Sequence, residues 1–141
     1  HDGEQLMNLL TSETGTLPHV LFLDLNMPRK NGFECLAEIK MHHALKELPV
    51  IIYSTSFHKK IATVLYEHGA TYYISKPYEI SKLKSAVHKA ILLIAEECFQ
   101  QPNKETFLLT EEKKNSKSFL WFADFFNLAD SVEPELIVSI I

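Results

Sequence analysis

Three short apolar runs, separated by helical patterns, constrain the fold of this chain more than any other feature. The runs are Val20–Leu23, "PVIIYS" at 49–54 and "TYYIS" at 71–75, and the helical patterns between them cover Phe33–Met41 and Ile61–His68. Unbroken apolar runs are typical of strands that are buried on both faces, as in a parallel sheet. The sequence therefore predicts an α/β fold, a doubly wound parallel sheet with helices on both faces.

Two further helices and one boundary complete this organisation. Apolar residues at helical spacing predict a short helix over Glu4–Leu10 and a long one over Glu79–Phe99. From residue 100 the sequence turns polar and charged, apart from an apolar island at Phe107–Leu109 and an aromatic-rich segment after it. We therefore predict a domain over 1–99 and a C-terminal extension over 100–141, whose aromatics pack on their own domain or on a partner subunit.

Charge, hydropathy and cysteine content exclude several function classes. A net charge of −4 argues against non-specific nucleic-acid binding, which needs a basic patch. No run approaches the roughly twenty apolar residues of a membrane-spanning helix. Cys35 and Cys98 lie far apart and give neither a disulfide framework nor a zinc motif. These features predict a cytoplasmic protein that binds neither nucleic acid nor membrane directly.

Polar residues with complementary chemistry follow all three predicted strands. Asp24 follows the first strand, Ser54 and Thr55 lie at the end of the second, and Lys76 follows the third. Since ligand sites of such sheets lie at the carboxyl ends of the strands, we expect these side chains to converge. A carboxylate nucleophile, an ammonium and a hydroxyl are the groups that phosphoryl transfer to an aspartate needs. Mg²⁺, which prefers hard oxygen ligands, would take Asp24 and the backbone carbonyl of Asn26.

The motifs that carry these residues resemble a known family. "LFLDLNMPRKNGFECL", "PVIIYSTS" and "GATYYISKPY" are similar, in order and spacing, to the receiver domain of two-component response regulators across roughly residues 1–98. The resemblance implies a CheY-like, flavodoxin-like fold with five strands. It also implies that a histidine kinase or a phosphotransfer protein phosphorylates Asp24.

Further residue roles rest on the resemblance. It implies Ser54 as the switch hydroxyl, Tyr73 as the aromatic that changes rotamer with it, and Lys76 as the phosphate-binding lysine. It also implies a cis peptide at Pro77, and Thr55 would tune access to the phosphate. Because Tyr72 and Tyr73 alternate along a strand, we expect one of them to face the core and the other solvent.

The chain also departs from the family pattern. The family's first strand, first helix and second strand are not in this sequence, and the acidic pair that binds Mg²⁺ is absent with them. Three explanations stay open: the sequence is part of a longer chain, the open edge of the sheet pairs with another copy in a homodimer, or the C-terminal "ELIVSII" fills the vacant strand position. Within the family, the motifs look closest to stand-alone receivers, some of which partner bacteriophytochrome-type kinases.

The function expected from these features is a phosphorylation-controlled binding module with only slow autodephosphorylation as its enzymology. Its partner-binding face would be made by the last two helices and the last strand. One alternative is a scaffold with the receiver fold that is never phosphorylated. The other is an aspartate-dependent phosphohydrolase, although that chemistry wants a second acid two residues after the nucleophile, where Asn26 stands.

Overall fold

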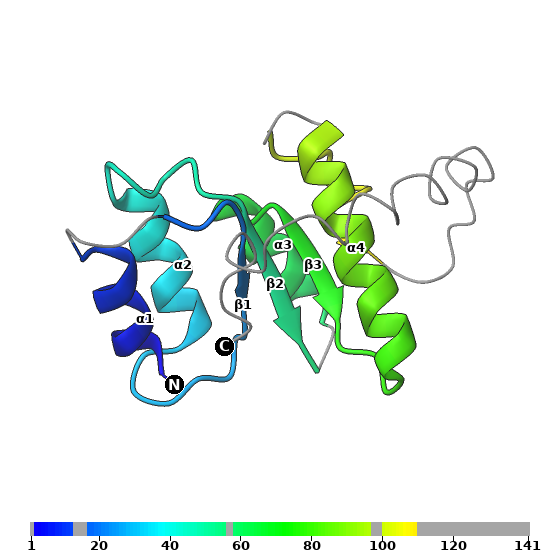
Figure 1. Ribbon diagram of the computed structural model, residues 1–141, viewed down its shortest axis with the longest axis horizontal. Coiled ribbons are helices and arrows are strands. Elements are labelled where there is room, and N and C mark those ends of the chain that lie inside the picture. Colours follow the sequence, from blue (N-terminus) through cyan, green and yellow to red (C-terminus); the bar gives the residue numbers. More distant parts are fainter. Residues whose placement is uncertain (1, 13–16, 56–57, 97–99, 110–141) are drawn as a thin grey trace, which may run out of the picture.

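A four-stranded parallel sheet forms the centre of the computed structural model, which describes residues 2–12, 17–55, 58–96 and 100–109 (Figure 1). Its strands lie side by side in chain order: β1 (Leu21–Leu23), β2 (Val50–Ser54), β3 (Tyr72–Ser75) and β4 (Leu108–Leu109). The helices are α1 (Gly3–Leu10), α2 (Gly32–Met41), α3 (Lys59–Glu67) and α4 (Ile80–Glu96). The predicted α/β class and its parallel sheet are confirmed.

Helices cover both faces of the sheet, with α4 on one side and α1 and α2 on the other (Figure 1). Alternate residues of β2 enter two separate apolar clusters: Val50 and Ile52 pack with side chains from α1, α2 and α3, whereas Ile51 packs with side chains from α4. Burial on both faces explains why the strands read as unbroken apolar runs. Within the described residues, no helix combines the length and hydropathy that a membrane crossing would need.

The two adjacent tyrosines of β3 are both buried, so the prediction that one of them faces solvent is wrong. Tyr72 is 1% exposed and lies in the cluster beneath α4, whereas Tyr73 is 0% exposed and lies in the opposite cluster. The side chains do alternate across the strand as predicted. Neither reaches solvent, because each face of the sheet is covered.

Strand β4 was not predicted from the sequence. It pairs in parallel with the outer edge of β3, and the backbone N–H of Tyr73 donates to the carbonyl of Phe107 at 2.9 Å. The division of the chain at residue 99 remains a prediction, but part of the predicted extension contributes a strand to the sheet. The predicted aromatic-rich segment and the C-terminal "ELIVSII" lie outside the described residues.

Side-chain contacts attach the segment before β4 to the end of α3. The Gln101 amide donates to the carbonyls of Tyr66 and Ala70 at 2.7 and 2.8 Å, and the Tyr66 hydroxyl donates to the carbonyl of Pro102 at 2.9 Å. Phe107 is 3% exposed and makes an edge-on ring contact with Tyr66, with the centroids 5.3 Å apart. The segment 101–109 is therefore held by hydrogen bonds and by apolar packing.

The loop between β1 and α2 is fixed at both of its ends. Asn31 caps α2 in a reciprocal capping box with Glu34. Gly32 donates its N–H to the Leu25 carbonyl at 3.1 Å, and a Cβ added at Gly32 would lie 2.8 Å from the Leu25 Cα. Arg29 has a positive φ of 63° and forms an ion pair with Asp2, the N-cap of α1. These contacts hold the chain that follows β1 in one path.

Candidate functional site

Asp24 and Lys76, predicted from the ends of two different strands, meet in the structure. Asp24 comes directly after β1 and Lys76 directly after β3, and the Lys76 ammonium donates to one oxygen of the Asp24 carboxylate. Their side chains are 17% and 25% exposed. The pair is therefore accessible from solvent but partly desolvated, which strengthens the attraction between the two charges.

The second oxygen of the Asp24 carboxylate is held by the chain itself. It accepts a hydrogen bond of 2.9 Å from the backbone N–H of Asn26, two residues further along. Such a turn fixes the orientation of the carboxylate, so that the two oxygens face different partners. The side chain of Asn26 is exposed and takes no part in this bond.

Ser54 and Tyr73 are both buried, and Ser54 and Asp24 both influence the pKa of Tyr73. Ser54 is 1% exposed and Tyr73 is 0% exposed. Burial raises the pKa of the Tyr73 phenol above its usual range, while a hydrogen bond with the Ser54 side chain lowers it and the Asp24 charge raises it. The charge on Asp24 thus influences the pKa of Tyr73. The structure shows the tyrosine in its buried position.

The backbone before Pro77 anchors the lysine. The N–H of Lys76 donates to the carbonyl of Ser54 at 2.8 Å, which extends the β2–β3 pairing to the site. The prediction of a cis peptide at Pro77 is wrong, since no peptide bond among the described residues is cis. The trans form is the intrinsic preference of such bonds, and Lys76 reaches Asp24 with it. Thr55 lies exposed at the end of β2.

Tyr53 is a neighbour of the site that the sequence did not reveal. The Lys76 ammonium lies 4.5 Å from the centre of the Tyr53 ring, within the range of a cation–π contact. In the sequence Tyr53 is only one more apolar residue of a buried strand. The sequence does show an aromatic residue directly before Ser54. Its contact with Lys76 can be inferred only when β2 is known to lie between β1 and β3.

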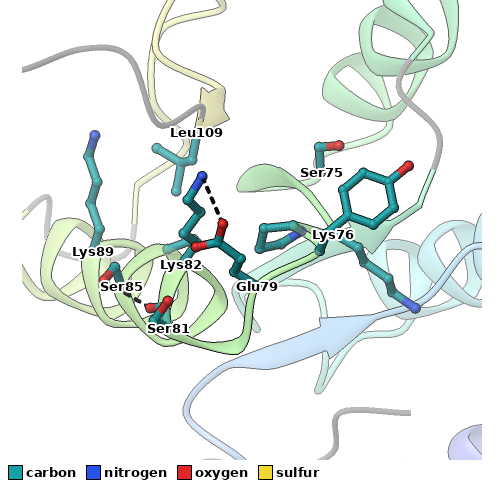
Figure 2. Close-up of a pocket in the computed structure, with 11 residues that line it drawn as sticks. Ser75, Lys76, Glu79, Ser81, Lys82, Ser85, Lys89 and Leu109 are labelled. Atoms are coloured by element: carbon teal, nitrogen blue, oxygen red, sulfur yellow. Dashed lines mark hydrogen bonds and ion pairs between the residues drawn. The ribbon is translucent and has the colours of Figure 1, made fainter.

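A groove of about 900 Å³ lies beside the site but does not contain Asp24. It runs from Pro77 along α4 to Leu109, and Lys82 and Lys89 line it. Figure 2 shows the Lys76 side chain extending away from these two lysines. Lys76 also lines this groove, whereas its partner Asp24 does not.

The Mg²⁺ ligands predicted from the sequence, Asp24 and the backbone carbonyl of Asn26, both lie within the described residues. No cluster of three or more His, Cys, Asp or Glu side chains exists in the described ranges. Mg²⁺ is usually held by one or two carboxylates together with water and phosphate oxygens. Asp24 and the Asn26 carbonyl therefore stay predicted ligands of Mg²⁺.

Comparison with known proteins points to one family. Residues 1–88 match the response regulator receiver domain family. The chain is 37% identical over 71 residues to response regulator Rcp1 of Synechocystis, a match that covers 50% of this chain and 48% of Rcp1. It is 35% identical over 100 residues to the DNA-binding transcriptional regulator NtrC of Klebsiella pneumoniae, covering 71% of this chain and 20% of NtrC. The chain thus spans less than half the length of these curated relatives.

Solved structures give the same picture. The fold is similar to that of the phosphorylated cyanobacterial phytochrome response regulator RcpA, with a TM-score of 0.60, 32% identity and coverage of 72% of this chain and 75% of that one. It is also similar to the Mn²⁺-bound form of response regulator Rcp1, with a TM-score of 0.57, 30% identity and coverage of 73% and 74%.

Proposed function

Because this chain belongs to the response regulator receiver domain family and has its CheY-like fold, we propose that it accepts a phosphoryl group on Asp24. The donor would be a sensor histidine kinase or a phosphotransfer protein. The observation that carries the proposal is the contact between the Lys76 ammonium and the Asp24 carboxylate at the carboxyl edge of the sheet. It brings a nucleophile and a compensating charge to one point.

In the proposed step, the phosphoryl group moves from a nitrogen of the donor histidine to a carboxylate oxygen of Asp24. A carboxylate oxygen of Asp24 forms a bond to phosphorus as the bond between phosphorus and the donor histidine nitrogen breaks, and the imidazole leaves with a proton from solvent. The transferred group gathers negative charge on its outer oxygens, and the Lys76 ammonium is placed to neutralise it. Water would later cleave the acyl phosphate slowly, which is the only enzymatic activity proposed.

The proposed signal runs from the phosphate through Ser54 and Tyr73 to the face made by α3, β3 and α4. Ser54 influences the pKa of Tyr73, whose ring lies 6.4 Å from that of Phe107, which in turn contacts Tyr66 of α3. A movement of Tyr73 would therefore reach both α3 and the segment 101–109. A small change of charge at Asp24 would in this way bias the conformation of the partner-binding face.

The remaining parts of the proposal concern surroundings and partners. Mg²⁺ would be the metal, with Asp24 and the Asn26 carbonyl as two of its ligands and with Thr55 tuning access to the phosphate. The output would be a protein bound at the α3–β3–α4 face, without direct nucleic-acid or membrane contact, in the cytoplasm. A phytochrome-type kinase as the donor is supported by the similarity to the phytochrome response regulator RcpA.

One alternative has an observation in its favour. A scaffold that keeps the receiver fold without being phosphorylated would fit a site around which the described residues form no cluster of three or more His, Cys, Asp or Glu side chains. Such a protein would retain the fold and the Asp24–Lys76 contact as structural features. It would bind its partner identically with and without a phosphoryl donor.

Intact-mass measurement separates the two functions. The protein expressed from its complete reading frame is incubated with Mg²⁺ and acetyl phosphate, alongside the Asp24→Asn variant. A mass gain of one phosphoryl group in the wild type that is lost in the variant supports the receiver. An unchanged wild-type mass, under conditions that phosphorylate a known receiver in the same tube, supports the scaffold.

A further inference from the structure

The position of Tyr53 follows from the order of the strands. Strand β2 lies between β1, which leads to Asp24, and β3, which leads to Lys76. The Lys76 side chain must therefore cross the carboxyl end of β2 to reach the carboxylate. The residues at that end are Ser54 and Tyr53, and successive residues of a strand point to opposite faces.

These two residues hold Lys76 at two different points. The Ser54 carbonyl accepts the backbone N–H of Lys76 at 2.8 Å, and the Tyr53 ring lies 4.5 Å from the ammonium. Tyr53 itself is half-buried and packs against the apolar cluster beneath α4, beside Ile74 of β3. Its ring is thus fixed by the core while one side of it meets the lysine.

We propose that Tyr53 is a positioning residue that keeps the Lys76 ammonium at the phosphate site, a role that rests on the proposed function of Asp24. A lysine carries its charge on a flexible four-carbon stem and is strongly hydrated, so it tends to swing into bulk water. The negative face of an aromatic ring compensates part of the lost hydration without neutralising the charge. The ring therefore leaves the ammonium positive for the phosphoryl oxygens.

This role differs from that of a residue that fills space in the core. A filler would be replaced without loss by an aliphatic side chain of similar size, because only volume and apolar area would matter. A positioning ring could be replaced without loss by Phe, which keeps the ring face. Replacement by Leu would remove the ring face and the contact with it. The dependence on ring electrons distinguishes the two roles.

The first test measures the contact itself. Lysine ε-methylene protons above an aromatic face are shifted upfield by the ring current, so NMR spectra of the wild type, Tyr53→Phe and Tyr53→Leu are compared. We expect the shift of the Lys76 signals in the first two proteins and its loss in Tyr53→Leu. Unshifted Lys76 signals in the folded wild type would overturn the proposal, whatever the protein does with phosphate.

The second test measures the consequence. With acetyl phosphate and Mg²⁺, Tyr53→Phe should be phosphorylated at a rate close to wild type, and Tyr53→Leu about tenfold more slowly, the order of effect that a cation–π contact gives. In a Lys76→Ala background, Tyr53→Leu should cause no further loss. Equal rates for Leu and wild type, or an undiminished effect of Leu without Lys76, would overturn the proposal.

Fluorinated phenylalanines at position 53 keep the test valid if Tyr53→Leu does not fold. They preserve the shape of the ring while withdrawing electrons from its face, so the rate should fall stepwise with fluorine number. A rate independent of fluorination would overturn the proposal. If Asp24 in the wild type accepts no phosphoryl group at all, the proposed function fails and the positioning role fails with it, whereas the ring-current shift still shows whether the contact exists.

Discussion

Lys76 reaches from the end of β3 to the carboxylate of Asp24 at the end of β1, across the strand that separates them. The two residues are 52 positions apart in the sequence, so only the parallel sheet brings them together. The contact also ties the two strand ends together at the edge where the proposed chemistry takes place. Loss of the Lys76–Asp24 contact should therefore slow the phosphorylation of Asp24 more than it destabilises the fold.

Replacing Lys76 by alanine should slow phosphorylation by acetyl phosphate about a hundredfold, since one preorganised donor to a developing negative charge contributes on that order. Initial rates from phosphoprotein gels or intact mass measure the effect. Lys82→Ala is the matched control, because Lys82 is a lysine of α4 that lines the neighbouring groove and does not contact Asp24. Equal losses in the two variants would show that Lys76 has no special role.

Replacing Phe107 by alanine should lower the free energy of unfolding by about 3–5 kcal/mol, the usual cost of removing a buried phenylalanine. Phe107 is 3% exposed and contacts Tyr66 and Tyr73, so the loss reports how firmly the segment 101–109 is attached. Urea denaturation measures it. Met41→Ala, at an 87% exposed position, should change the same quantity by less than about 0.5 kcal/mol. A Phe107 effect as small as this would mean that β4 is not bound in solution.

Replacing Gly32 by alanine should impair the site itself. The added Cβ would contact the Asp24 carbonyl and lie 2.8 Å from the Leu25 Cα, so the loop after β1 has to move. We expect a loss of about 1–3 kcal/mol of stability together with slower phosphorylation.

Gly69→Ala provides the control for this variant. Gly69 has a positive φ of 86°, so alanine is strained there, but its Cβ would meet only the flexible Lys40 side chain. Both variants should therefore be less stable by urea denaturation, and only Gly32→Ala should lose phosphorylation rate. A normal rate in folded Gly32→Ala would contradict the proposed link between the loop and the acceptor.

The Tyr73 phenol should make the fold sensitive to alkaline pH. Its pKa is raised in the folded protein, chiefly by burial, whereas in the unfolded chain it is about 10. The folded state thus keeps a proton that the unfolded state loses. This contribution to stability is fully present below the unfolded pKa and is lost as the pH rises through the folded pKa.

Urea midpoints measured from neutral to alkaline pH test this dependence. Tyr73→Phe should remove part of the fall in stability above about pH 10. Tyr78→Phe is the control, because it removes a fully exposed tyrosine and leaves Tyr73 in place. A Tyr73→Phe profile that falls as steeply as the wild type would contradict the assignment.

The sequence predicted those features that repeat along the chain. Unbroken apolar runs located β1, β2 and β3, and the parallel order of the strands was enough to bring Asp24 and Lys76 together. The helical pattern predicted over Ile61–His68 is followed by Gly69, which has the positive φ that is common where a helix ends.

Features that depend on distant partners were not predicted. Strand β4 has only two residues, so its pattern is too short to recognise, and it exists because the edge of β3 is available for pairing. The burial of both Tyr72 and Tyr73 depends on helices that cover both faces. The contact of Tyr53 with Lys76 depends on the path that the Lys76 side chain takes across β2.

The most direct test of the central claim is to locate the phosphoryl group. The protein from the complete reading frame is treated with Mg²⁺ and acetyl phosphate, then reduced with borohydride, which converts an aspartyl phosphate to homoserine, and its peptides are sequenced by mass spectrometry. We predict homoserine at position 24 in the treated wild type and none in a sample without acetyl phosphate. Homoserine at another aspartate, or an unmodified Asp24 in protein that has gained a phosphoryl group, would contradict the account.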